Sequence, residues 1–264
     1  MKKTPALELR DVSYVAGGKK ILDSIDWTVQ PGEHWAILGP NGSGKTTLLR
    51  IASGYLWPND GGEVYRKGET LTHLPELRKS IGWVTAALAN EIPFHERALN
   101  TVVSGKFAQI GYLGGHWGQA SGYDFTNARR YMKELGCDYL REQEFGTLSQ
   151  GEQQKVLIAR ARMTKPYLII LDEPCAGMDP GAREYFLASL RKLGAQKKIP
   201  ALIYVTHHVE EILPLFRKTL VLRDGKVLHA GETSEVLKAP TLKELYGASL
   251  SLIRRNGRYW PVGK

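Results

Sequence analysis

This sequence of 264 residues contains three groups of residues that could bind or react with a ligand. Each group directly follows a short apolar run. They are the glycine-rich segment 39–46 (GPNGSGKT), the acidic pair Asp172 and Glu173, and His207 with its neighbours. A glycine-rich backbone with a lysine suits phosphate groups, and carboxylates suit a metal ion or an attacking water. A histidine ring can donate a hydrogen bond or accept a proton. The combination indicates chemistry on a phosphorylated ligand.

The glycine-rich segment matches G-x-x-x-x-G-K-[ST] at every fixed position, between a predicted strand and a predicted helix. Gly42 and Gly44 let the backbone curl so that its N–H groups face the phosphates. Lys45 supplies a positive charge to the β- and γ-phosphates, and Thr46 offers its hydroxyl to Mg²⁺. The alternative is a chance glycine-rich turn before a helix, which does not explain why the whole pattern is satisfied.

The acidic pair follows a predicted strand. Asp172 is placed to hold the Mg²⁺ shell, as the carboxylate of a P-loop NTPase does. Adjacent residues of an extended strand alternate faces, so Glu173 is expected to point elsewhere and to orient or deprotonate the attacking water. His207 is a candidate sensor of the γ-phosphate. The alternative for Asp172 and Glu173 is that, with Pro174, they only end the strand. The alternative for His207 is an ordinary loop residue.

Three runs are apolar throughout rather than alternating, at residues 35–38, 167–171 and 201–205. Unbroken apolar runs are typical of strands in a parallel sheet whose two faces are both covered. In open α/β sheets the ligand lies at the carboxyl ends of the strands, which is where all three chemical groups stand. We therefore predict an α/β fold with a mostly parallel core sheet.

A fourth polar segment, LSQGEQQK at residues 148–155, contains no nucleophile with its base and no metal site. Ser149 and Glu152 have the spacing of a capping box at the start of a helix. The other interpretation is that the exposed N–H groups of this helix end receive an anion. The segment alone favours the capping interpretation.

Composition narrows the functional classes. Apolar content of 42% and charged content of 24% are typical of a globular protein. We find no secretory signal and no apolar run near the about 18–20 residues that span a bilayer, and two cysteines without CxxC spacing suggest a reducing cytoplasm. The net charge of +9 is mostly scattered, with one cluster at 254–258, so nucleic acid is not the expected partner.

The order of these motifs resembles that of the ATP-binding subunits of ABC transporters along almost the entire chain. Residues 39–47 resemble the Walker A motif, 168–174 the Walker B motif, and 148–155 the signature usually written LSGGQ. Residues 175–180 are similar to the D-loop, and 205–207 to the switch-histidine motif.

This resemblance implies a P-loop NTPase fold that fills residues 1–264. Its RecA-like core, with an N-terminal antiparallel β part, would comprise 1–85 and 149–264, and a helical subdomain would be inserted at 86–148. It also implies the cofactors ATP and Mg²⁺. Two copies would close head to tail, each signature touching the γ-phosphate of the ATP that the other copy holds. The further partners are an integral membrane permease and, as an additional candidate, a substrate-binding protein, at the inner face of the cell membrane.

The resemblance also extends the set of site residues. Glu173 becomes the catalytic glutamate, His207 the switch histidine, and Thr46 and Asp172 the magnesium ligands. The nucleotide contacts are Gly39, Pro40, Asn41, Gly42, Ser43, Gly44, Lys45, Thr46, Thr47, Tyr14, Ser149, Gly151, Glu152 and Asp179. In the helical part, Tyr112 and Trp117 either meet the permease or pin their own loop.

The sequence departs from the family at three places. Ala86 stands where the family has a glutamine that contacts Mg²⁺ and water, and a methyl group can do neither. Ala16 stands where an aromatic usually stacks on adenine. Tyr14 shares its strand face and is either a substitute or a core tyrosine. Glu152 replaces the signature glutamine and adds a charge that calls for a neighbouring cation.

Two functions follow from this sequence. The first is an ATPase subunit that drives a membrane transporter, and residues 222–232 and 242–247 resemble importers of the iron-chelate, haem, cobalamin and molybdate type. The second is a soluble ABC-type ATPase that switches another assembly. A P-loop kinase would leave the segment 148–155 unexplained.

Overall fold

The computed structural model describes residues 4–70, 73–115, 118–196 and 199–263. The chain forms two compact units, one made of the residues up to 81 together with those from 201 onward, the other of residues 82–200. Within the described ranges, no helix is both long and apolar enough to span a bilayer.

A parallel sheet forms the centre of the first unit. β3 (Trp35–Leu38) pairs in parallel with β7 (Ala201–Thr206) on one side and with β8 (Lys218–Arg223) on the other. β9 (Lys226–Glu232) adds an antiparallel edge to β8. Every residue of β3 and β7 is buried, as expected for strands covered on both faces. The two apolar runs predicted as strands in this unit are confirmed.

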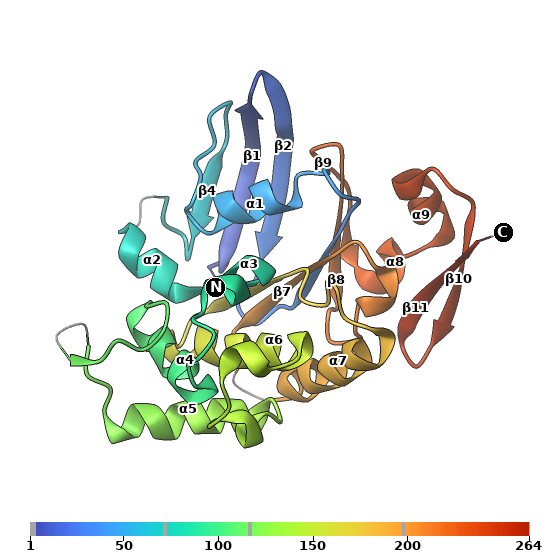
Figure 1. Ribbon diagram of the computed structural model, residues 1–264. Coiled ribbons are helices and arrows are strands. Elements are labelled where there is room, and N and C mark those ends of the chain that lie inside the picture. The colour runs from blue at the N-terminus through green and yellow to red at the C-terminus, as the bar shows by residue number, and fades with distance from the viewer. Residues whose placement is uncertain (1–3, 71–72, 116–117, 197–198, 264) are drawn as a thin grey trace. The chain divides into compact units, whose positions relative to one another are not determined.

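The N-terminal strands form a separate antiparallel sheet in the order β2–β1–β4, visible in Figure 1. The strands are β1 (Leu7–Ala16), β2 (Lys19–Val29) and β4 (Glu63–Arg66). β1 is irregular, with register shifts between Leu9 and Val15. The predicted antiparallel β part is present.

Helix α1 (Lys45–Ala52) is the next element after β3, joined to it by the glycine-rich loop. Its last carbonyls are held by Arg66, whose buried guanidinium donates to the oxygens of Ala52 and Ile51. A cation at a helix C-terminus satisfies unpaired carbonyls and opposes the negative end of the helix dipole. The remaining elements of this unit are α2 (Leu74–Ser80), the 3₁₀ turn η6 (Val209–Glu211), α8 (Thr233–Val236), α9 (Ala239–Tyr246), β10 (Leu250–Arg255) and β11 (Arg258–Gly263).

The second unit combines two neighbouring strands with a group of helices. β5 (Ile81–Thr85) lies beside β6 (Leu168–Asp172), which confirms the third apolar run as a buried strand. The helices are α3 (Ala86–Glu91), α4 (Ala98–Ser104), α5 (Gly122–Glu134), α6 (Gln150–Ala161) and α7 (Pro180–Gly194). Short 3₁₀ turns connect them at η1 (Gly105–Phe107), η3 (Asp138–Leu140), η4 (Phe145–Thr147) and η5 (Arg162–Thr164).

The glycine-rich stretch before α5 is held by Tyr112. Its hydroxyl accepts a hydrogen bond from the Ala120 backbone N–H at 2.8 Å, and its ring lies 6.2 Å from that of Phe107 and 6.0 Å from that of Phe125. This aromatic therefore pins its own loop. Trp117 lies outside the described residues.

Candidate phosphate-binding site

The glycine-rich loop of the first unit joins β3 to α1 and closes around the amine of Lys45. The Nζ atom donates to the carbonyl oxygens of Gly39 at 2.8 Å and Pro40 at 2.9 Å, and the side chain is 6% exposed. The loop is thus curled around its own lysine. Thr46 and Thr47 occupy the second and third positions of α1.

Close packing explains two of the glycines. Gly44 has φ +100°, and a Cβ there would lie 2.9 Å from the carbonyl oxygen of Ile21. A Cβ on Gly39 would lie 2.4 Å from the carbonyl oxygen of Leu222. No side chain fits at either position, and φ at Gly44 is in the left-handed region that other residues avoid. The loop is therefore wedged between β8 and the start of β2.

The loop has groups suited to a phosphate. The Ser43 hydroxyl oxygen is buried and has no hydrogen-bond partner among the described residues, which is uncommon for a buried polar atom. Gly44, the residue before α1, has no side chain, so no cap side chain bonds to the N–H groups of the first turn of α1. Asn41 and Gly42 are exposed on the same loop. Unpaired donors at a helix N-terminus bind anions, so these residues fit the phosphates of a nucleotide.

In the second unit, β6 ends at Asp172, and Glu173 has φ +48°. The expectation that strand alternation turns Glu173 away from Asp172 therefore rests on the wrong conformation, because Glu173 is past the strand and in the left-handed region. A non-glycine residue held there costs on the order of 1–3 kcal/mol and is typical of functional sites. Both carboxylates belong to partly exposed residues.

The signature segment forms the predicted capping box at the start of α6. The Glu152 backbone N–H donates to the Ser149 hydroxyl at 3.4 Å, while the Glu152 carboxylate accepts from the backbone N–H of Ser149 at 3.0 Å and from its hydroxyl at 2.7 Å. The capping interpretation is confirmed. In this structure the Ser149 hydroxyl therefore donates its hydrogen bond to Glu152 of the same helix.

The neighbour of Glu152 is a tyrosine that sequence reasoning missed. The Tyr139 hydroxyl donates to the second carboxylate oxygen at 2.8 Å. Burial by itself would raise the pKa of Glu152, but the hydrogen bonds from Ser149 and Tyr139 and the charge of Lys155 hold it below its ordinary value. The predicted cation, Lys155, therefore contributes only part of the stabilisation of the Glu152 charge, because the hydroxyls of Ser149 and Tyr139 make the direct contacts. No local sequence pattern reveals Tyr139, which is 63% exposed.

Asp179 caps α7. Its carboxylate accepts from the Ala182 backbone N–H at 2.9 Å, and Pro180 follows at the first helical position. An aspartate before proline is a recognised helix start, so this role could have been read from the sequence. The D-loop and the signature lie close together within the unit, since a Cβ on Gly151 would be 3.8 Å from the Met178 sulfur.

His207 follows β7 directly and is half-buried. Its ring centroid lies 4.1 Å from that of His208. Its backbone carbonyl accepts a hydrogen bond from the Tyr246 hydroxyl at 2.9 Å. Four residues further along the chain, the buried Glu211 carboxylate accepts from the Thr206 hydroxyl at 2.6 Å.

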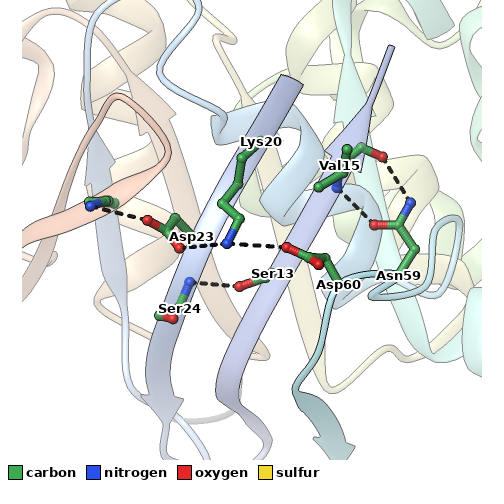
Figure 2. Close-up of polar contacts among 8 residues, drawn as sticks. Ser13, Val15, Lys20, Asp23, Ser24, Asn59 and Asp60 are labelled. Atoms are coloured by element: carbon green, nitrogen blue, oxygen red, sulfur yellow. Dashed lines mark hydrogen bonds and ion pairs between the residues drawn. The ribbon is translucent and has the colours of Figure 1, made fainter. Parts of the chain in front are cut away.

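Tyr14 lies half-buried near the end of β1, next to a backbone that is held firmly. Figure 2 shows the Asn59 side chain bonded to both the N–H and the C=O of Val15, each at 2.8 Å. It also shows Lys20 between Asp23 and Asp60, with 3.1 Å to each carboxylate. The β1–β2 hairpin is therefore anchored by Asn59, which lies 44 positions from Val15 in the chain.

Ala86 is exposed and is the first residue of α3. The Thr85 hydroxyl caps this helix by accepting from the Leu88 backbone N–H at 3.1 Å. The segment after β5 is thus a helix start, and its alanine offers no polar group.

Each unit gathers part of the predicted set. The first contains the phosphate loop, Tyr14 and His207. The second contains Asp172 with Glu173 at the end of β6, and Ser149, Gly151, Glu152 and Asp179 around the starts of α6 and α7.

The sequence matches the family model described as ABC transporter over residues 22–176. It is 38% identical over 255 residues to the ABC transporter ATP-binding protein YlmA of Bacillus subtilis, covering 96% of this chain and 95% of that protein. The ADP conformation of MJ1267, an ATP-binding cassette of an ABC transporter, has a TM-score of 0.77 at 26% identity, covering 92% of this chain and 98% of that one.

A dimeric, post-hydrolysis structure of the ATP-binding cassette MJ0796, bound to ADP and phosphate, is also similar. Its TM-score is 0.69 at 26% identity, with 86% of this chain and 98% of that one covered. The predicted α/β cassette fold, with its mostly parallel core sheet, antiparallel strands and helical insert, is confirmed by these structures.

Proposed function

This chain belongs to the ABC transporter family as an ATP-binding, ATP-hydrolysing subunit, and we propose that residues 39–47 bind the phosphates of the ATP. The observation that carries this proposal is the phosphate loop. It combines a buried lysine, a buried serine hydroxyl without a partner among the described residues, and a helix start without a side-chain cap.

In this proposal, the first unit binds the nucleotide. Residues 39–47 surround the phosphates with backbone N–H groups, and Lys45 lies against the β- and γ-phosphates. Tyr14 lies beside the base. Mg²⁺ would be held by the Thr46 hydroxyl and the Asp172 carboxylate, oxygen ligands of the kind it prefers. When bound, this ion neutralises negative charge on the phosphates.

The reaction is hydrolysis of the terminal phosphate. Glu173 orients the attacking water and takes its proton, a contribution of about 10²–10⁴-fold in rate. His207 donates a hydrogen bond from its ring to the γ-phosphate. The position of Glu173 directly after Asp172, at the end of β6, supports its role, and its left-handed backbone sets the direction of the side chain there.

The second copy completes each site. Ser149, Gly151 and Glu152, with Asp179 nearby, are proposed to meet the ATP held by the partner in a head-to-tail dimer. The N-terminus of α6 carries a partial positive charge that suits the γ-phosphate. ATP then joins the two copies, and hydrolysis releases them.

ABC ATP-binding subunits pair with membrane permeases, and we propose the same for this chain. The helical subdomain would be residues 86–148, inserted in a core formed by 1–85 and 149–264, and it would receive the permease. The protein would act at the inner face of the cell membrane. The C-terminal segments 222–232 and 242–247 support an importer of the iron-chelate, haem, cobalamin or molybdate type, with a substrate-binding protein as a further partner.

Replacing the proposed base tests the chemistry. We expect Glu173→Gln to lower the ATPase rate at least a hundredfold, because the amide cannot take a proton, while ATP binding is retained and a dimer accumulates. Turnover assays and size-exclusion chromatography with ATP measure both effects. Glu142→Gln, a surface carboxylate 60% exposed in the same unit, is the control. Wild-type turnover in Glu173→Gln would disprove the assignment.

The comparisons do not favour the soluble switch ATPase considered from the sequence. Co-purification from membranes separates the two functions directly. A transporter subunit should retain a polytopic membrane protein in a pull-down with or without a non-hydrolysable ATP analogue. Recovery of ribosomes or nucleic acid alone would support the alternative.

A further inference from the structure

The C-terminal part of the first unit contacts the backbone that follows the switch histidine. Residues 207–211 connect β7 to the rest of the unit through the turn η6. Two side chains from the C-terminal part, Tyr246 of α9 and Arg258 of β11, donate hydrogen bonds to carbonyl oxygens in this short segment. Figure 1 shows α9 and the β10–β11 hairpin as one neighbouring group at the end of the chain.

Tyr246 contacts the histidine residue itself. Its hydroxyl donates to the backbone oxygen of His207 at 2.9 Å. Burial, with a smaller effect from the Glu210 carboxylate, raises the pKa of Tyr246 to about 12. The phenol therefore keeps its proton at physiological pH and remains a donor.

Arg258 holds the same segment three residues further on. Its Nε atom donates to the Glu210 backbone oxygen at 2.8 Å, and Nη2 donates to the same oxygen. The guanidinium carbon lies 4.8 Å from the ring centroid of Trp260, which orients the group. The hairpin turn is also close, since a Cβ on Gly257 would lie 2.8 Å from the Pro214 side chain.

Hydrogen bonds with Tyr204 and Thr206 of β7 also hold this segment. The Thr206 hydroxyl accepts from the His208 backbone N–H at 2.9 Å and donates to Glu211. The Tyr204 hydroxyl donates to the same carboxylate at 3.0 Å. His207 therefore lies between hydrogen-bonded neighbours, and its carbonyl, like that of Glu210, accepts a hydrogen bond from the C-terminal part.

We propose that Tyr246 and Arg258 are positioning residues for ATP hydrolysis, which hold the backbone of the switch segment so that the ring of His207 meets the γ-phosphate. This inference rests on the role proposed for His207. It gives the C-terminal α9 and β10–β11 elements a part in catalysis without any contact to nucleotide. A small displacement of a catalytic group has a large effect on rate, so one lost hydrogen bond is expected to be measurable.

The direct test is Tyr246→Phe, which removes one hydroxyl and keeps the ring. We expect kcat for ATP to fall about threefold to tenfold, the effect of one ordinary hydrogen bond, while KM for ATP stays within about twofold. Arg258→Ala should act in the same direction. Tyr259→Phe and Arg255→Ala, which change the same hairpin, are the matched controls and should keep wild-type kcat. Thermal unfolding of each variant checks that the fold is intact.

A double variant separates positioning from general stability. If Tyr246 acts through His207, then Tyr246→Phe should cause no further loss of kcat in a His207→Ala background. Additive losses would show a separate structural effect and overturn the inference. Wild-type turnover in Tyr246→Phe, beside an impaired His207→Ala, would also overturn it while leaving the proposed function standing. Wild-type turnover in His207→Ala would instead remove the proposed role of the histidine.

Discussion

Among the single residues, Lys45 shows most directly how the loop is prepared for its ligand. Its amine is buried and donates to two carbonyls of the same loop. A lysine placed this way fixes the curl of the backbone and keeps a positive charge at its centre. Since both functions depend on one ammonium group, its removal affects the shape of the loop and the charge together.

We expect Lys45→Ala to lower ATP affinity at least tenfold. The lost charge and the relaxed loop both weaken phosphate binding. Titration with a fluorescent ATP analogue measures the affinity, and Lys243→Ala, an exposed lysine of α9, is the control. Unchanged affinity in Lys45→Ala would contradict the assignment of the phosphate loop.

At the level of elements, the start of α6 combines a structural and a functional part. Ser149 and Glu152 cap the helix, and Tyr139 fixes the free side of the carboxylate. For Ser149 to donate to a partner's phosphate, its bond to Glu152 must be exchanged. The cap therefore orders the helix end and also competes for the hydroxyl that the ATP would need.

The cap predicts a pH dependence of stability. The pKa of Glu152 is lowered in the folded protein, so its ionised form is favoured by folding. This contribution is present above the pKa of the unfolded chain and is lost as pH falls through the folded value. We expect Glu152→Ala to reduce the free energy of unfolding by about 1 kcal/mol at pH 7, and the difference from wild type to shrink below about pH 4.

Urea denaturation at pH 7 and below about pH 4 measures this change in the free energy of unfolding. Glu142→Ala, which removes an exposed carboxylate of the same unit, should show little change at either pH. A loss for Glu152→Ala that is equal at both pH values would mean that the ionised carboxylate is not its source.

At the scale of the whole molecule, some of the proposed site residues contact the ATP bound by their own chain and others contact the ATP bound by the partner. The phosphate loop and the signature segment belong to different units. In the proposed dimer, the signature serves the partner's ATP. A defect in one chain should then be repaired by a chain with a different defect.

Mixing two inactive variants tests this arrangement. Ser149→Arg places a large cation where the phosphate should meet α6, and Lys45→Ala disables the loop, so each alone should be nearly inactive. A mixed dimer contains one site with an intact loop and an intact signature, and ATPase activity should reappear on mixing. Absence of any recovery, in a mixture shown to form mixed dimers, would contradict the head-to-tail site.

Much of this protein could be predicted because its signals are local. The spacing of Gly39 to Thr46 predicts the phosphate loop, Ser149 and Glu152 predict a helix start, and three apolar runs predict three buried strands. In the loop and at the helix start the interacting groups are close in the chain, so their types and spacing determine the structure. For the strands, an unbroken apolar run is itself the signal of burial on both faces. The motif order was also sufficient to predict the family.

Only the tertiary structure decided which distant groups hold those local pieces in place. Asn59 supports Val15 from 44 positions away, and Tyr246 reaches His207 from 39. Such pairs follow from how strands and helices pack, and no periodicity in the chain encodes them. The left-handed conformation of Glu173 belongs to the same class, because surrounding packing must impose it on a residue that would otherwise avoid it.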